Sequence, residues 1–368
     1  PPPASRPLSS SHAHPTPTPA LLSSPQPSPH TTTTQPAQMF LTDKYHALLP
    51  LHSAPATRGP RKAAAVPAVT SRFDAALAAR FGGLLPLPAS PLAALARLAD
   101  LLAATLADAV PALAAVPGDG KKDAVAVAAH VDAGVALLDA CNAIAARVDR
   151  LRRRRLLSRL ALHLVSSTPP SPSSLSRARA ALADRDGRGA GGTPSSALPA
   201  LPSIPFVDPP RGGRRQQLTA AARVVLAVNA VSSLAATAAA TILGGTSSTN
   251  RDSTFPQVSG DLPWAESFNA VSSQLSALAK SGTSNEIHAA DEAVGKLAAV
   301  LECAAPEEAA LRAATQEVEK RTEELAARLE RVSDAVNGVF RAALRLRNAE
   351  LGSFMAAGPA GKAPRSKK

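Results

Sequence analysis

The chain has 368 residues, is rich in alanine and leucine, and contains only 3% aromatic residues. A core of Ala, Leu and Val favours closely packed helices and suits neither a β-sandwich nor a β-barrel, whose strands prefer β-branched and aromatic side chains. The formal net charge of +12 would fit nucleic acid or an anionic membrane as a partner, but much of this excess is arginine in linkers and in one short run.

The N-terminal segment, residues 1–70, is predicted to be disordered because it has many prolines and no hydrophobic periodicity. Residues 1–38 contain no acidic residue and many Pro, Ser and Thr. This composition resembles a plastid transit peptide, but it equally resembles translated upstream sequence. We favour the second interpretation, with Met39 as the biological start.

Three helices are predicted in an N-terminal half, residues 71–167. The first begins at Ser71, with Asp74 as an acidic capping-box partner, and ends at Gly82 and Gly83. The second runs from Pro91 to Val110 with Ser90 as its N-cap. The third runs from about Asp123 to Val165. One apolar face of this helix has 4-3-4-3 spacing and consists of Leu137, Cys141, Ile144, Val148 and Leu151. After an arginine run the apolar face is expected to resume with Leu157, Leu160 and Leu164.

A Pro/Gly/Ser-rich linker is predicted at residues 168–217, with a short helix in SLSRARAALAD. An Ala-rich helix then covers residues 218–246, and no charged residue occurs between positions 224 and 250. It is long enough to span a bilayer, but its Ala, Ser and Thr content suits a buried helix of a soluble bundle equally well. The apolar residues that would be buried or face lipid are Val224, Leu226, Val228, Val231, Leu234, Ile242 and Leu243.

The C-terminal half, residues 262–356, is predicted to contain three helices before a basic tail at 357–368. The last helix, from about Pro306 to Phe354, carries a seven-residue apolar series: Leu311, Val318, Leu325, Val332, Val339 and Leu346. Such a seam suits antiparallel packing in a bundle or a short coiled coil. The predicted fold class is therefore all-α, an elongated multi-helix bundle with long antiparallel helices.

The strongest candidate binding patch is an arginine cluster on the third helix: Arg147, Arg150, Arg152, Arg153, Arg154, Arg155 and Arg159. It could contact phosphate on lipid or nucleic acid. Alternatively, it is a solvated stretch paired with Asp149 and with the acidic last helix. Nucleic acid is the weaker partner because no aromatic residue is interleaved with these arginines.

No catalytic or cofactor motif is present: the chain lacks HExxH, GxSxG, a Walker loop and GxGxxG. His130 and His163 lie too far apart along one helix to share a metal ion. Cys141 and Cys303 form no CxxC pair, and we expect two small buried side chains rather than a disulfide or a zinc site. The sequence therefore predicts a protein that is not an enzyme and has no cofactor or metal.

Four segments, taken in order, resemble the plant BYPASS-related family. They are LLDACNAIAARVDRLRRRRLLSRLALHLV at 137–165, VSSLAATAAATILGGTSS at 231–248, LPWAESF at 262–268 and VFRAALRLRNAELGSF at 339–354. The resemblance covers roughly residues 71–355. The RRRR run departs from a more polar, less basic segment in the family, so no family trait is inferred for that patch.

The resemblance implies a plant-specific helical protein without enzymatic activity, associated with developmental control of a root-derived mobile signal. We expect it to act through protein contacts at or near a membrane. One alternative is a single-pass membrane adaptor in secretion that depends on the exocyst, with an exocyst-type component as partner. A further alternative, an enzyme of carotenoid-related signal metabolism, follows only from the signalling association. We expect the protein to be membrane-associated or otherwise cytoplasmic, and residues 1–38 give only a weak indication of plastid targeting. The sequence leaves the oligomeric state open.

Overall fold

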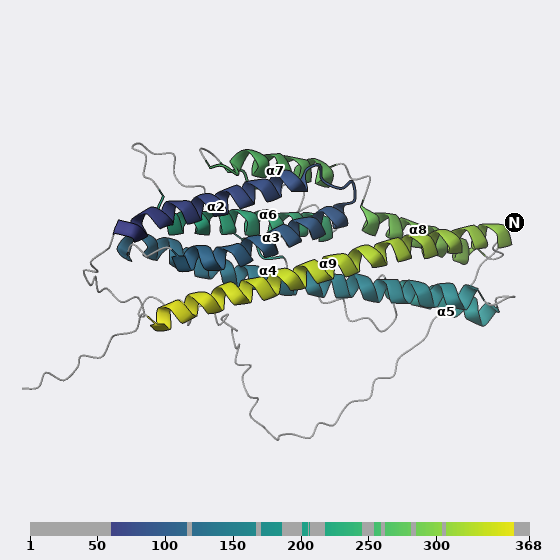
Figure 1. Ribbon diagram of the computed structural model, residues 1–368. Coiled ribbons are helices and arrows are strands. Elements are labelled where there is room, and N and C mark those ends of the chain that lie inside the picture. Colours follow the sequence, from purple (N-terminus) through teal and green to yellow (C-terminus); the bar gives the residue numbers. More distant parts are fainter. Residues whose placement is uncertain are drawn as a thin grey trace, which may run out of the picture. The chain divides into compact units, whose positions relative to one another are not determined.

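The computed structural model describes residues 60–115, 120–166, 171–185, 201–204, 206, 218–244, 254–258, 262–280, 285–303 and 307–356. These residues form eight α-helices and no strand, which confirms the all-α prediction (Figure 1). The helices are α2 (Pro60–Leu84), α3 (Pro91–Ala115), α4 (Gly120–Val165), α5 (Pro172–Arg185), α6 (Ala220–Leu243), α7 (Ala265–Lys280), α8 (Glu286–Glu302) and α9 (Glu308–Ala356). The segments at 1–59, with the suggested transit-like or upstream part, and at 357–368 lie outside the described residues.

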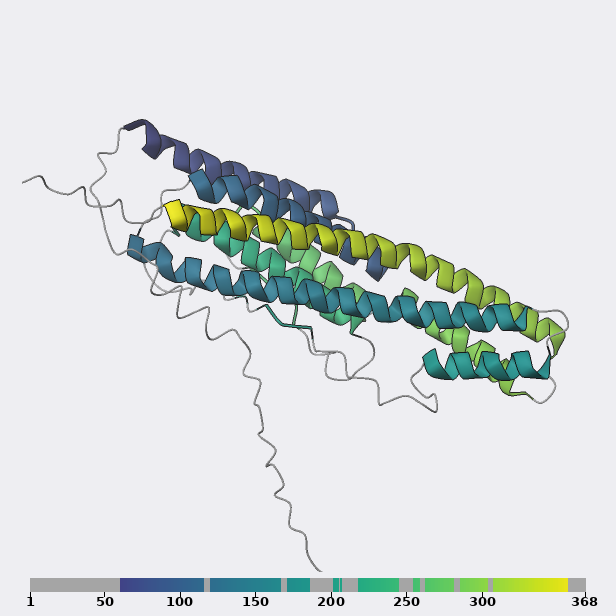
Figure 2. The same cartoon turned by 90° about the horizontal axis from the view of Figure 1, so that it is seen from below.

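The two longest helices, α4 and α9, run side by side in opposite directions (Figure 2). Residues near the start of α4 meet the end of α9, as His130 meets Glu350, and residues further along meet earlier positions, as Arg155 meets Glu323. The antiparallel pairing predicted for the long helices is confirmed. α3 makes the most extensive contact with α9, and α6 packs between α3 and α4.

The buried apolar residues form two clusters. The larger one joins α2, α3, α4, α6, α7 and the C-terminal half of α9, and it includes Trp264, Phe268 and Phe81. The Phe81 and Phe268 rings meet edge to face at 5.4 Å between centroids and tie α2 to α7. The smaller cluster joins the end of α4, α5, α8 and the start of α9, around Leu297, Leu301 and Val318. The seven-residue series of α9 is buried throughout and passes from one cluster to the other.

The first helix begins earlier than predicted, because α2 starts at Pro60 rather than Ser71. Residues 61–66, RKAAAV, are mostly good helix formers, and proline fits the first helical position. The disorder predicted up to residue 70 is therefore wrong for 60–70. Ser71 lies in the middle of the helix, and Asp74 is a buried side chain rather than a capping partner.

A further boundary differs from the prediction, because α3 continues through Pro111 to Ala115, and its flanking residues Ala109 and Ala112 are buried. The short helix expected in SLSRARAALAD, within the linker at 168–217, is α5, whose Ala178, Ala181 and Leu182 belong to the smaller cluster. Packing against α4 and α8 holds this short helix in place.

The core face of α4 resumes only in part where it was predicted: Leu160 is exposed, Leu157 is half-buried, and Leu164 packs partly buried against the smaller cluster. The buried residues after the arginine run are Ser158, Ala161 and Val165, of which Ser158 and Val165 keep the helical phase of Ile144 and Val148. A helix that stays regular presents the same face along its length, whatever residues occupy that face. Leu160 therefore points outward, and so does Leu156.

Candidate functional site

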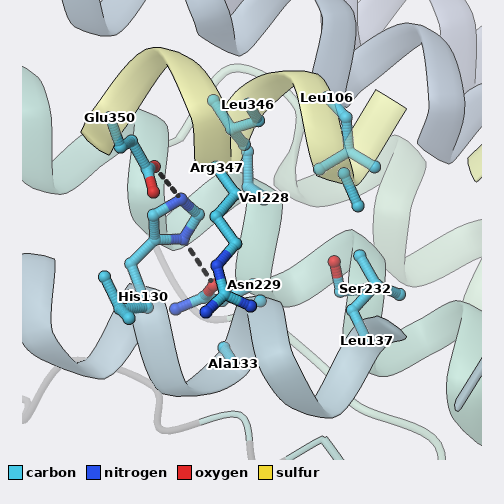
Figure 3. Close-up of a pocket in the computed structure, with 13 residues that line it drawn as sticks. Leu106, His130, Ala133, Leu137, Val228, Asn229, Ser232, Leu346, Arg347 and Glu350 are labelled. Carbon is cyan, nitrogen blue, oxygen red and sulfur yellow. Dashed lines mark hydrogen bonds and ion pairs between the residues drawn. The ribbon is translucent and has the colours of Figure 1, made fainter. Parts of the chain in front are cut away.

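A small cavity lies where α4, α6 and α9 meet, with Leu106 of α3 closing one side (Figure 3). Its volume is about 30 Å³, room for one or two water molecules. The polar lining residues are His130, Asn229, Ser232, Arg347 and Glu350, and the other residues around it are mainly apolar.

His130 has an acceptor at each ring nitrogen. Its Nε2 lies 2.8 Å from Glu350 Oε1, and its Nδ1 lies 3.2 Å from Asn229 Oδ1. Burial alone would lower the pKa of His130, but the contacts with Glu350 and Asn229 outweigh it and raise the pKa above its ordinary value. The doubly protonated ring can donate to both oxygens, so this arrangement favours an imidazolium ion paired with a carboxylate.

The cluster can bind a proton on His130 and a water molecule in the cavity. Its contacts also fix the register of α4, α6 and α9. Among the described residues, no group of three or more His, Cys, Asp and Glu side chains could hold a metal ion. The sequence pattern raised His130 only as a possible metal ligand and gave no sign of its pairing with Glu350. The available signal was Asn229, an amide side chain within the charge-free stretch of α6, which needs a polar partner if it faces the core.

A second buried polar cluster ties α2 to α6 and α7. Asp74 Oδ1 accepts a hydrogen bond from Trp264 Nε1 at 3.2 Å, and its Oδ2 pairs with Arg223. Burial raises the pKa of Asp74, although Arg223 and the Trp264 hydrogen bond each oppose that shift. Helical periodicity placed Asp74 near the helix start and gave no sign of these distant partners.

Most of the arginine cluster pairs with neighbouring helices. Arg152 binds Glu330 of α9 through two nitrogens, at 3.2 and 2.8 Å, and also contacts Asp149 at 3.0 Å. Arg155 lies 2.9 Å from Glu323 of α9, and Arg159 reaches the same carboxylate at 3.6 Å. The acid-paired alternative weighed from the sequence therefore describes these three residues.

Two other arginines of the cluster tie further helices together. Arg154 lies 2.9 Å from Asp291 of α8, which also pairs with Arg185 of α5. Arg147 donates to the carbonyl of Leu243 at 3.2 Å and so satisfies the last turn of α6. Burial, together with nearby Arg150, lowers the pKa of Arg147.

Arg150 and Arg153 differ from the rest of the cluster. Both are exposed, and within the described part of the chain no hydrogen bond or ion pair engages either guanidinium. They precede the outward-facing leucines along α4, of which Leu156 is 62% and Leu160 44% exposed. The solvent-facing part of the predicted patch is therefore mixed, basic and apolar.

The uncharged segment forms α6, with Thr219 as its N-cap. Of its candidate residues, Leu226 is partly exposed and the rest are buried in the larger cluster: Val224, Val228, Val231, Leu234, Ile242 and Leu243. Within the described helices, α3 and α6 are long and apolar enough to cross a membrane. In the most apolar stretch of α6, 67% of the residues are buried inside the bundle.

The two cysteines lie in different environments. Cys141 is buried in α4, and burial raises the pKa of its thiol to about 12. Cys303 is exposed at the C-terminal end of α8. The prediction of two buried cysteines is wrong for Cys303, because the helical face that would bury it ends at Leu301.

Comparison of the chain with protein-family models, with curated proteins and with solved structures finds no match.

Proposed function

We propose that this chain is a non-catalytic regulatory protein that acts through protein contacts at or near a membrane. One observation carries the proposal: the buried ionisable side chains His130 and Asp74 each pair with an ionisable residue of another helix. His130 with Glu350 joins α4 to α9, and Asp74 with Arg223 joins α2 to α6. Groups that already satisfy one another in this way suit a scaffold, whose surface makes the functional contacts.

The resemblance to the BYPASS-related family supports a plant developmental role, restraint of a root-derived mobile signal. Its four segments fall within or around α4, α6, α7 and α9. These helices contribute most of the larger cluster, so the resemblance concerns the part of the chain that builds the core. It contributes no catalytic residue, and the alternative of a carotenoid-related enzyme has no side chain in its favour.

The test replaces the polar groups while keeping the fold. His130→Gln with Glu350→Gln retains hydrogen-bonding side chains but removes the acid and the base. In plants that lack the protein, we expect this double variant and the unchanged chain to restore normal shoot growth equally well. If the variant folds, judged by circular dichroism, and yet fails to restore growth, the cluster takes part in chemistry and the proposal is wrong.

The contacts around α6 favour a protein that meets the membrane with its outer surface over one that is anchored by α6 as a single membrane span. Its C-terminal carbonyls, those of Leu243 and Ile242, accept hydrogen bonds from Arg147 and Asn285, which belong to other parts of the bundle. Insertion of α6 into a bilayer would break these contacts and expose the apolar faces of α3 and α4. We expect carbonate to release the Met39-initiated protein from membranes. Retention after carbonate would support the single-pass adaptor in exocyst-linked secretion instead.

A further inference from the structure

The outer side of α4 carries a second 4-3-4-3 series, opposite the one that packs in the core. All its members are exposed: Asn142, Ala146, Asp149, Arg153, Leu156, Leu160 and His163. This spacing keeps side chains on one face of a helix and is the pattern by which helices pack against a partner helix. Leu156 and Leu160 stand one turn apart in this series, where a partner would cover them.

Two arginines stand beside the two leucines. Arg153 precedes Leu156 by one turn, and Arg159 lies next to Leu160. The Arg159 side chain is 56% exposed and comes no closer than 3.6 Å to its carboxylate partner, Glu323. Its charge therefore remains accessible. A partner that covers the leucines and carries carboxylates beside them complements this surface.

Three other occupants fit less well. A flat anionic membrane is negative over its whole area and would also face the exposed carboxylates of Asp149, Glu323 and Glu330, whereas a helix can place its own carboxylates beside Arg153 and Arg159 and keep them away from these three. A second copy paired through the leucines in antiparallel register would set His163 against Arg153 and so bring no carboxylate to that arginine. The chain's own terminal segments are poor in acid: residues 1–59 contain only Asp43, and residues 357–368 contain none.

We propose that the outer face of α4 between Asp149 and His163 is a docking seam for an acidic amphipathic helix of a partner protein. The inference rests on the proposed function, action through protein contacts, and identifies the contact surface. Leucine-type side chains of the partner pack on Leu156 and Leu160, and its glutamates or aspartates lie beside Arg153 and Arg159.

The experiment uses the full chain and a synthetic amphipathic helix with leucines at heptad core positions and glutamates flanking them. A second peptide carries lysines in place of the glutamates. Binding is followed by fluorescence anisotropy at two salt concentrations, because attraction between exposed charges weakens as salt rises. We expect the acidic peptide to bind, with weaker binding at high salt, and the basic peptide not to bind.

Variants then locate the site. Leu156→Gln with Leu160→Gln should weaken binding by about tenfold or more, since two leucine contacts are lost. Leu344→Gln on α9 is the matched control, because it removes a leucine that is also exposed but lies outside the seam. Leu344→Gln should leave binding unchanged, and all three substitutions should leave the free energy of unfolding nearly unchanged.

The proposal is wrong if the acidic peptide does not bind, or if it still binds the Leu156/Leu160 double variant. It is also wrong if the unchanged chain binds phosphatidylserine vesicles, or associates with itself in sedimentation, and the double variant does not. These last two results would show that the two leucines contact a membrane or a second copy of the chain. The plant assay separates this failure from failure of the proposed function. If the double variant does not restore growth although the peptide never bound, the contact function stands and the acidic helix is the wrong occupant.

Discussion

Three buried or half-buried ionisable residues each lie where three segments of the chain meet. His130 joins α4 to α6 and α9, and Asp74 joins α2 to α6 and to Trp264 beside α7. Asp291 joins α8 to α4 and α5 through Arg154 and Arg185. An apolar contact tolerates a small slip of one helix along another, whereas these pairs lose their partners when a helix shifts by one turn. Their main contribution is therefore to fix the register of the bundle.

Stability should depend on pH through His130. Its folded-state pKa is raised, so the folded protein binds this proton more tightly than the unfolded chain does. The stabilisation is full below about pH 6.5 and is lost as the pH rises through the folded pKa, at no more than about 1.4 kcal/mol per pH unit. Urea unfolding at several pH values should show this loss for the unchanged chain and not for His130→Gln. Parallel pH profiles for the two proteins would contradict the prediction.

Asp74→Ala should destabilise the fold by about 2–3 kcal/mol, because it leaves the buried indole N–H of Trp264 without its acceptor and opens a small void. Asp74→Asn keeps an acceptor for Trp264 and should cost less. Urea denaturation at pH 7 measures both values. Equal losses for the two variants would mean that the charge on Asp74, rather than the hydrogen bond, matters most.

Reactivity should distinguish the two thiols. The pKa of about 12 and the burial of Cys141 keep it protonated and out of reach, whereas Cys303 is exposed. We expect maleimide to label one cysteine per native chain and two in urea, as counted by mass spectrometry. Cys303→Ser should abolish the native labelling. Native labelling that persists in this variant would show that the core around Cys141 opens readily.

At the scale of single helices, apolar periodicity predicted most elements because each long helix buries one continuous face. The series from Leu311 to Leu346 on α9 is the clearest case. Periodicity failed where the core face carries small or polar residues, as at Ser158 and Ala161 on α4, since the larger leucines nearby suggested a different face. The polar contacts of His130 and Asp74 could not be predicted, because their partners come from distant helices whose relative rotation no local pattern specifies.

The packing of α6 can be tested with one added side chain. Ala238 is fully buried among the neighbours of α6, whereas Ala240 is only partly covered. Ala238→Leu should destabilise the protein by about 1–3 kcal/mol through overpacking, and Ala240→Leu should cost less. Thermal and urea unfolding measure both. In a helix facing lipid the extra leucine would be tolerated, so an unchanged stability of Ala238→Leu would favour the bilayer-spanning alternative.

On the scale of the whole molecule, the two apolar clusters predict two levels of local stability. The larger cluster contains the bulky aromatic residues and most leucines, while the smaller one has no aromatic residue and consists of leucines, valines and alanines. Fewer buried carbon atoms give less free energy against opening. Amides of α5 and α8 should therefore exchange with solvent faster than those of α3 and α6, through an opening that leaves the larger cluster intact.

Leu297→Ala provides the decisive form of this prediction, because Leu297 is fully buried at the centre of the smaller cluster. Truncation should cost about 2–4 kcal/mol and accelerate exchange in α5, α8 and the first half of α9. Leu234→Ala in α6 is the matched substitution in the larger cluster and should accelerate exchange throughout the bundle. Hydrogen exchange followed by mass spectrometry separates the two patterns. If Leu297→Ala accelerates exchange equally in α3 and α6, the two clusters unfold as one cooperative unit. The contacts that could couple them are the ion pairs that Arg152, Arg154 and Arg155 of α4 make with α8 and α9.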